Sequence, residues 1–147
     1  MKVRIVWIGK TKDSNLSRLI ADYASRIEHF FKLEIVELKD PKRPEDESDK
    51  ILASLDSSDR VVALDPRGKA WTSEEFSKVI SKHMREDPRR LTFVIGGPNG
   101  LSAEVRKRAD LSWSLSSMTF THDLSRVLIL EQIYRAFSII HNHPYSR

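Results

Sequence analysis

An apolar run that ends abruptly in a cluster of glycines limits the folds open to this chain more than any other stretch. Residues 91–95 read LTFVI, which is typical of a buried strand, and residues 96–100 read GGPNG. Three glycines and a proline allow sharp turns, and the missing Cβ atoms let a ligand approach the backbone closely. Open α/β sheets bind ligands where strands end in such loops. We therefore predict a ligand site at residues 96–100, with the uncharged run at 115–120 as its second wall.

Strand-like and helix-like patterns alternate along the rest of the chain. Apolar and β-branched runs predict the strands, and apolar residues at three- and four-residue spacing predict the helices between them. This alternation is typical of a single α/β domain over residues 1–147, with a mostly parallel sheet and helices on both faces. The predicted strands cover residues 3–8, 33–38, 60–64, 91–95 and 113–115.

Capping residues mark where several of the helices begin. Asn15 can cap the first helix, and Thr72 and Glu75 have the spacing of a capping box. Thr121 or Asp123 opens the last helix. That helix is apolar on more than one face, which predicts burial beyond its own subunit.

Three charged segments have less specific patterns. Residues 65–69, DPRGK, follow the third predicted strand and are interpreted as a turn at the same sheet edge as the glycine loop. Residues 39–49 carry two prolines and charges of both signs, which predicts a loop. The basic triplet at residues 106–108 fits either a solvated helix face or a phosphate-binding patch.

Charge and composition limit the classes of function. A net charge of +4 fits a polyanionic partner such as RNA, although many small basic proteins bind none. The lack of cysteine excludes disulfides, thiolate zinc sites and a cysteine nucleophile. The histidine spacing predicts no metal site. Without a long apolar run or a signal-peptide pattern, we expect a cytoplasmic protein with no membrane contact.

Familiar catalytic and nucleotide-binding motifs are missing. The glycine loop does not match the dinucleotide fingerprint G-x-G-x-x-G, and it lacks the lysine of a P-loop. No G-x-S-x-G sequence marks a nucleophilic serine.

Several stretches in this order resemble the ribosomal large-subunit RNA pseudouridine-N3 methyltransferases, a branch of the SPOUT class. The resemblance covers nearly the whole chain, and the combination of motifs is far more specific than any one of them. It rests on FVIGGPNGLS at 93–102, WSLS at 113–116, THDLSR at 121–126, EQIYRA at 131–136 and NHPY at 142–145, with the strand at 3–9 and the turn at 64–69.

This resemblance implies a SPOUT fold with a C-terminal trefoil knot, and a homodimer that binds S-adenosylmethionine in the knot. The implied cofactor residues coincide with the two loops that the residue pattern selects as a ligand site. They are Leu64, Gly96, Leu115, Ser116, Ser117, Met118, Thr119 and Phe120.

The implied reaction is methyl transfer to N3 of a pseudouridine in 23S rRNA, within the large subunit or the assembled 70S ribosome. Such an enzyme must align the acceptor nitrogen with the methyl group and release the imide proton. His122 is our candidate base, with solvent as the alternative. Arg126 and Arg147 could stabilise the imide anion or hold a phosphate, and Tyr145 completes the candidate catalytic set. Family members commonly carry a histidine where this chain has Ser146.

Two other functions remain open from the sequence. A non-catalytic, basic RNA-binding ribosome assembly factor would explain the charge without requiring the cofactor loops. A nucleotide-binding oxidoreductase would need the dinucleotide fingerprint, which is broken here.

Overall fold

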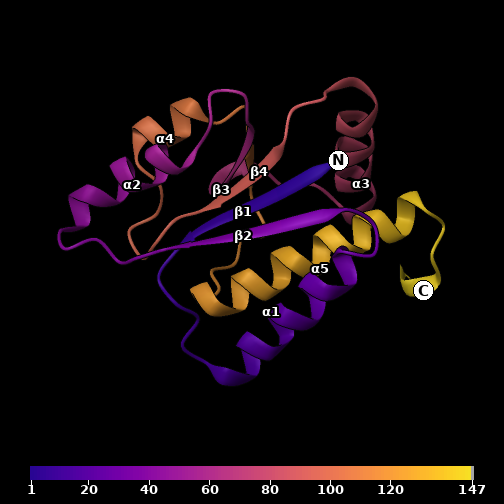
Figure 1. Ribbon diagram of the computed structural model, residues 1–147, viewed down its shortest axis with the longest axis horizontal. Coiled ribbons are helices and arrows are strands. Elements are labelled where there is room, and N and C mark those ends of the chain that lie inside the picture. Colours follow the sequence, from indigo (N-terminus) through magenta and orange to yellow (C-terminus); the bar gives the residue numbers. More distant parts are fainter. Residues whose placement is uncertain (147) are drawn as a thin grey trace.

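The computed structural model describes residues 1–146, and in them a five-stranded, wholly parallel sheet lies between two layers of helices (Figure 1). The α/β class, the parallel sheet and the helices on both faces are confirmed. The strands are β1 (Lys2–Ile8), β2 (Lys32–Leu38), β3 (Arg60–Lys69), β4 (Leu91–Ile95) and β5 (Leu111–Trp113), in the spatial order β2-β1-β4-β3-β5. The helices are α1 (Ser14–Ile27), α2 (Glu47–Ser54), α3 (Ser73–Glu86), α4 (Ala103–Arg108) and α5 (His122–Ile140), with short 3₁₀ turns η1 (Pro44–Asp46) and η2 (Pro144–Ser146).

Each face of the sheet has its own hydrophobic core because successive side chains of a strand point to opposite faces. On β4, Phe93 joins the larger core, which α1, α3 and α5 cover. Its neighbour Val94 joins the smaller core, beneath Ile51 of α2 and Val105 of α4. All five side chains of β4 are buried, as expected for the central strand of a parallel sheet.

Helix α5 packs against both α1 and α3 and lies alongside α1 in Figure 1. Its residues Leu130, Ile133 and Phe137 are fully buried in the larger core. These contacts within one chain account for the apolar residues on several faces of α5. The apolar pattern of this helix is therefore no evidence for burial against a second subunit.

Several predicted boundaries differ from the observed ones. Asp13, rather than Asn15, caps α1: its carboxylate accepts the amides of Asn15 and Leu16. Residues 44–46 form η1 and α2 begins at Glu47, so only the first part of the predicted loop at 39–49 lacks helical structure. Strand β5 ends at Trp113, two residues before the predicted end.

Other helix starts agree with the sequence. The capping box at Thr72 and Glu75 is present, with each side chain accepting the other residue's amide. Thr121 opens α5, and its hydroxyl accepts the amide of Leu124.

The predicted turn at residues 65–69 is instead the end of β3, which continues through an irregularity to pair again with β5. This continuation depends on Gly68. A Cβ atom there would lie 2.5 Å from the backbone carbon of Ser112, closer than real Cβ contacts permit. The close approach holds β3 and β5 together beside the carboxyl ends of the other strands.

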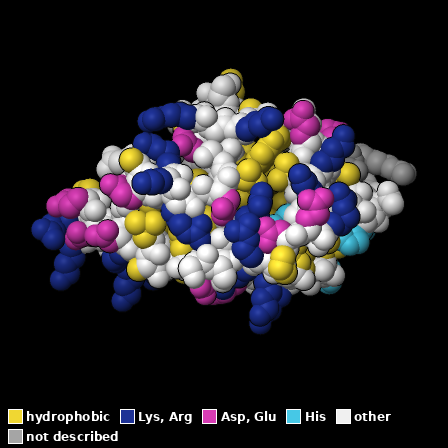
Figure 2. All heavy atoms as spheres, turned by 90° about the horizontal axis from the view of Figure 1, so that it is seen from above, with side chains coloured by type: hydrophobic (Ala, Val, Ile, Leu, Met, Phe, Trp, Pro, Cys, Tyr) yellow, Lys and Arg dark blue, Asp and Glu magenta, His cyan; other side chains and the backbone are white. Residues whose placement is uncertain are grey.

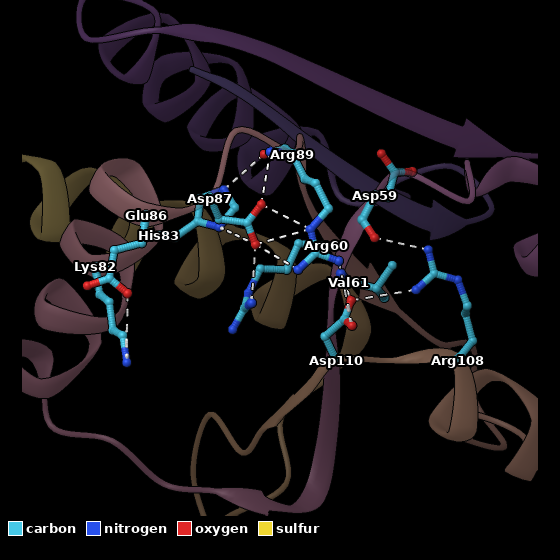
Figure 3. A network of polar contacts seen from close by, with 10 residues as sticks. All are labelled: Asp59, Arg60, Val61, Lys82, His83, Glu86, Asp87, Arg89, Arg108 and Asp110. Atoms are coloured by element: carbon cyan, nitrogen blue, oxygen red, sulfur yellow. Dashed lines mark hydrogen bonds and ion pairs between the residues drawn. The ribbon is translucent and has the colours of Figure 1, made fainter.

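Ion pairs cover the opposite edge of the sheet, where β3 and β4 begin (Figure 3). Asp87 accepts hydrogen bonds from Arg89 at 2.7 Å and from Arg60 at 3.3 Å. Nearby, Asp59 is only 1% exposed and accepts two hydrogen bonds from Arg90, at 2.7 and 3.0 Å. These contacts fix the strand ends that face away from the glycine loop.

Replacing Asp59 by alanine is expected to lower the free energy of unfolding by about 2–3 kcal/mol, because Arg90 loses both carboxylate contacts in a largely buried place. Burial acts to raise the pKa of Asp59, but hydrogen bonds from Arg90 and from the Asp56 amide outweigh it, so the pKa lies below its ordinary value. The carboxylate therefore stabilises the fold fully above its unfolded pKa of about 3.9, and this stability is lost as the pH falls through the lower native pKa. Thermal unfolding measured from neutral to acidic pH tests both statements.

The matched control is Asp22→Ala, which breaks the exposed ion pair between Asp22 and Arg26 on α1, 3.0 Å apart. Exposed pairs contribute little, so a much smaller loss is expected. Equal losses in the two variants would contradict the importance assigned to Asp59.

Candidate functional site

A pocket of about 490 Å³ lies at the carboxyl ends of β3, β4 and β5 and beside the first turn of α5. Its size falls within the usual range for small-molecule sites. Loops from four separate parts of the chain form its walls. The lining residues are Leu64, Asp65, Pro66, Arg67, Ile95, Gly96, Gly97, Pro98, Asn99, Gly100, Leu101, Arg106, Trp113, Leu115, Ser116, Ser117, Met118, Thr119, Phe120, His122, Ser125 and Ile129.

The glycine loop after β4 forms one wall. A Cβ atom on Gly96 would lie 2.8 Å from Leu101 Cδ2 and 3.0 Å from the Gly100 carbonyl carbon, so only glycine fits without displacing the loop. The Gly100 amide donates to the Gly97 carbonyl at 3.0 Å and closes a turn. Arg106 of α4 donates to the Leu101 carbonyl at 3.1 Å, which ties the end of the loop to the following helix.

The segment between β5 and α5 forms the facing wall. The backbone amide of Ser114 donates a hydrogen bond to the Lys69 carbonyl at 2.9 Å, and its hydroxyl donates one to the Ser116 carbonyl at 3.1 Å. Ser116 in turn accepts the Met118 amide at 3.0 Å. The Met118 side chain is 74% exposed at the pocket. The wall is thus shaped by local hydrogen bonds, with one flexible apolar side chain at its surface.

All eight residues implied as cofactor contacts line this pocket. Leu64 comes from β3, Gly96 from the glycine loop, and the run at 115–120 from the facing segment. The two loops predicted to form a ligand site are therefore brought together by the fold.

Of the four candidate catalytic residues, the three that the structure describes are not brought together. His122, the first residue of α5, is exposed and lines the pocket. Arg126 and Tyr145 lie elsewhere, as described next, and Arg147 is outside the described residues.

Arg126 is buried and holds the loop between β1 and α1. It is 4% exposed, and its guanidinium donates to the Ile8 carbonyl at 2.6 Å and to the Thr11 hydroxyl at 3.0 Å. The same group lies 4.7 Å from the centroid of the Trp7 ring. Burial lowers the pKa of Arg126, although the Asp123 carboxylate opposes this. In this position the side chain orders a loop rather than meeting a ligand in the pocket.

Asp123 holds the same loop from the first turn of α5. Its Oδ2 accepts the backbone amides of Lys12 and Asp13, at 2.9 and 3.1 Å. The start of α5 is therefore fixed to the carboxyl end of β1, and His122 is held beside the pocket.

Tyr145 belongs to a cluster near the other end of α5. Its hydroxyl donates to Glu131 at 2.9 Å and lies 3.0 Å from the hydroxyl of Tyr23, while Arg135 donates to the same Glu131 oxygen at 2.6 Å. The Tyr145 ring packs edge-on against Tyr134. Burial and the hydrogen bonds to Tyr23 and Glu131 raise the pKa of Tyr145.

Tyr145 is not among the residues that line the pocket. Its hydroxyl contacts Glu131, which is nine residues beyond His122 on α5. At 1.5 Å per residue, about 14 Å of helix separates Glu131 from His122. Tyr145 and His122 of one chain therefore do not meet at the pocket.

Sequence reasoning missed three charged residues of the pocket. Asp65 and Arg67 lie in the segment interpreted as a turn, and Asp65 is only 8% exposed. Arg106 lies 4.0 Å from Asp65. The signal for Asp65 and Arg67 was their place directly after the predicted strand at 60–64, at the edge where the glycine loop also lies.

Basic side chains on one face of the molecule are spread out rather than gathered in one patch (Figure 2). On the face seen in Figure 2, Lys and Arg side chains are separated by Asp and Glu, with hydrophobic side chains between them. Of the basic triplet, Arg108 donates to the carbonyls of Asp56 and Asp59, so it is structural, while Lys107 is exposed.

Among the described residues, no three His, Cys, Asp or Glu side chains converge as metal ligands would. No helix found in residues 1–146 is both long enough and apolar enough to cross a membrane.

Comparison with known proteins identifies relatives along the whole chain. A family model described as "Predicted SPOUT methyltransferase" matches residues 1–146. The ribosomal RNA large subunit methyltransferase H of Christiangramia forsetii is 44% identical, over 99% of this chain and 98% of the relative. The protein of the same name from Trichlorobacter lovleyi is 43% identical, over 99% of each chain.

Solved structures show a similar fold at low identity. A probable methylase family protein from Haemophilus influenzae has a TM-score of 0.58 at 13% identity, covering 98% of this chain and 68% of that one. The SpoU methyltransferase AviRb from Streptomyces viridochromogenes has a TM-score of 0.51 at 15% identity, covering 95% of this chain and 60% of that one. These likenesses agree with the knotted α/β fold implied by the motifs. With a family model matched over residues 1–146 and relatives above 40% identity along its full length, the chain belongs to the SPOUT methyltransferase family.

Proposed function

We propose that this protein transfers the methyl group of S-adenosylmethionine to 23S rRNA, at N3 of a pseudouridine, on the large subunit or the assembled ribosome. One observation carries the proposal. The eight residues assigned to the cofactor come from three separate parts of the chain and line a single pocket. Whole-length relatives named as ribosomal RNA large subunit methyltransferases support the choice of substrate.

The pocket suits this cofactor in size and in wall chemistry. At about 490 Å³ it can enclose a nucleoside-sized group, and the glycine loop exposes backbone groups without side chains in the way. Asp65 and Arg106 add one charge of each sign, which suits a ligand that carries both an ammonium and a carboxylate. S-adenosylmethionine supplies a methyl group already activated by its sulfonium.

The protein must align the acceptor and remove a proton. Alignment of the reacting atoms can supply about 7–11 kcal/mol of the barrier reduction. The pseudouridine N3 must lose its imide proton as the new bond to carbon forms. We assign His122, which lines the pocket, as the acceptor of that proton, with solvent as the alternative. We assign Arg126 an indirect role, because it orders the loop after β1 that Asp123 also holds.

The position of Tyr145 supports action by a homodimer. Within one chain Tyr145 does not line the pocket, and its hydroxyl contacts Glu131, about 14 Å along α5 from His122, so we infer that a second copy brings a tail to the pocket. A C2 dimer in which one tail reached the partner's pocket would contain two equivalent sites.

Substituting Gly96 with valine is expected to weaken S-adenosylmethionine binding about 5–150-fold, the effect of 1–3 kcal/mol of overpacking. The added side chain would collide with Leu101 and with the Gly100 backbone. Calorimetric titration of the purified protein measures the change, with NAD as a control ligand.

Ala103→Val adds similar bulk at an exposed position on α4 outside the pocket, and its affinity should match the wild type. A wild-type protein that bound rRNA but not S-adenosylmethionine would favour the assembly factor. Saturable binding of NAD would favour the oxidoreductase.

Deleting residues 145–147 is expected to abolish methylation of ribosomes that lack the modification, while cofactor binding survives.

Mixed dimers of this deletion variant and Gly96→Val then test whether a tail acts on its own pocket or on the pocket of the partner subunit. Random mixing makes half of all dimers mixed, each with one complete site of two, so about a quarter of wild-type activity should return.

Each variant alone serves as the control, and both should show little activity when S-adenosylmethionine is kept well below the weakened dissociation constant of Gly96→Val. No recovery in a mixture shown to contain mixed dimers would mean that the tail acts on its own pocket. Loss of cofactor binding in the deletion would contradict the separation of the two functions.

A further inference from the structure

Helix α2 holds the glycine loop through Glu47, the first residue of the helix. Glu47 Oε1 accepts the backbone amide of Gly97 at 2.6 Å. The two residues are fifty positions apart in sequence, and Gly97 lines the pocket whereas Glu47 does not. A Cβ atom on residue 97 would lie 2.9 Å from the same oxygen, so the glycine also makes room for the carboxylate.

A second contact holds the far end of the same loop. The hydroxyl of Ser48 lies 2.7 Å from the hydroxyl of Ser102, which also accepts the Val105 amide as the cap of α4. Ile51 of α2 and Leu101 belong to the same hydrophobic core. Glu47 and Ser48 thus contact the loop at Gly97 and Ser102, and Ile51, one turn later on α2, shares a hydrophobic core with Leu101.

The loop is a thin wall between two cavities. A smaller cavity of about 190 Å³ lies between the loop and α2. It shares Asn99, Gly100 and Leu101 with the larger pocket. Space behind the loop means that packing alone does not keep it in place. The Glu47 hydrogen bond spans this gap.

We propose that Glu47 is a positioning residue for the cofactor, which holds the glycine loop in its binding geometry before the ligand arrives. Glycine-rich segments lose more conformational freedom on ordering than other sequences, so a loop ordered in advance binds more tightly. A hydrogen bond from an amide to a carboxylate is among the stronger ones available to a backbone. The inference rests on the proposed function only in naming S-adenosylmethionine as the ligand.

The test compares Glu47→Ala with Glu47→Gln. Alanine removes the acceptor, whereas glutamine keeps an oxygen that can accept the Gly97 amide. In the ligand-free protein, amide hydrogen exchange at Gly97 should accelerate about tenfold in the alanine variant and much less in the glutamine variant. Calorimetry should show the dissociation constant for S-adenosylmethionine rising by about the same factor in the alanine variant, with substantial rescue by glutamine.

Asp49→Ala is the matched control. Asp49 is an exposed acid in the same first turn of α2, so it shares the interaction of Glu47 with the helix dipole but not the contact with Gly97. In Asp49→Ala, the rate of amide hydrogen exchange at Gly97 and the affinity for S-adenosylmethionine should match those of the wild type.

Unchanged hydrogen exchange at Gly97 in Glu47→Ala would overturn the proposal, and so would faster exchange with an unchanged affinity for S-adenosylmethionine. Equal losses of affinity in Glu47→Ala and Asp49→Ala would also overturn it. A wild type that does not bind S-adenosylmethionine would refute the proposed function instead. The exchange data would then still decide whether Glu47 holds the loop.

Discussion

Parallel pairing places every strand's carboxyl end at one edge of the sheet, and the rest of the molecule depends on that constraint. The second half of β3 and the loops that follow β4 and β5 meet there and enclose the pocket, although they are far apart in sequence. The opposite edge carries the ion pairs of Asp59 and Asp87. Loop backbone and small side chains thus form much of the pocket edge, whereas ion pairs between charged side chains cover the opposite edge.

Helix α5 connects the parts of the site because different parts of the helix contact the loop after β1, the pocket and the tail. Its first turn holds the loop after β1 through Asp123 and Arg126 and presents His122 to the pocket. Its middle is buried between α1 and α3. Glu131, at its midpoint, holds Tyr145 of the tail. Tyr145 is thereby kept out of the pocket of its own chain, which is why a second chain is central to the proposed mechanism.

Local patterns predicted the elements well, and the misses have physical reasons. The capping box at Thr72 depends only on residues three apart, so it could be read directly. Asp13 and Asn15 are both good caps, and the fold selects Asp13, whose own amide is held by Asp123 from the far end of the chain. The segment at 65–69 contains proline and glycine and reads as a turn, but Gly68 allows β3 to continue against Ser112.

The sequence by itself determined the α/β class, the order of the elements and, through the family motifs, which residues would line the pocket. Each of these depends on periodicity, on short spacings or on a recurring set of motifs. Only the tertiary structure decided that Arg126 is buried against β1, that Tyr145 lies far from His122 of its own chain, and that Glu47 meets Gly97. Those contacts join residues from 50 to 118 positions apart, or depend on the path of the tail, and such separations leave no repeating pattern in a single sequence.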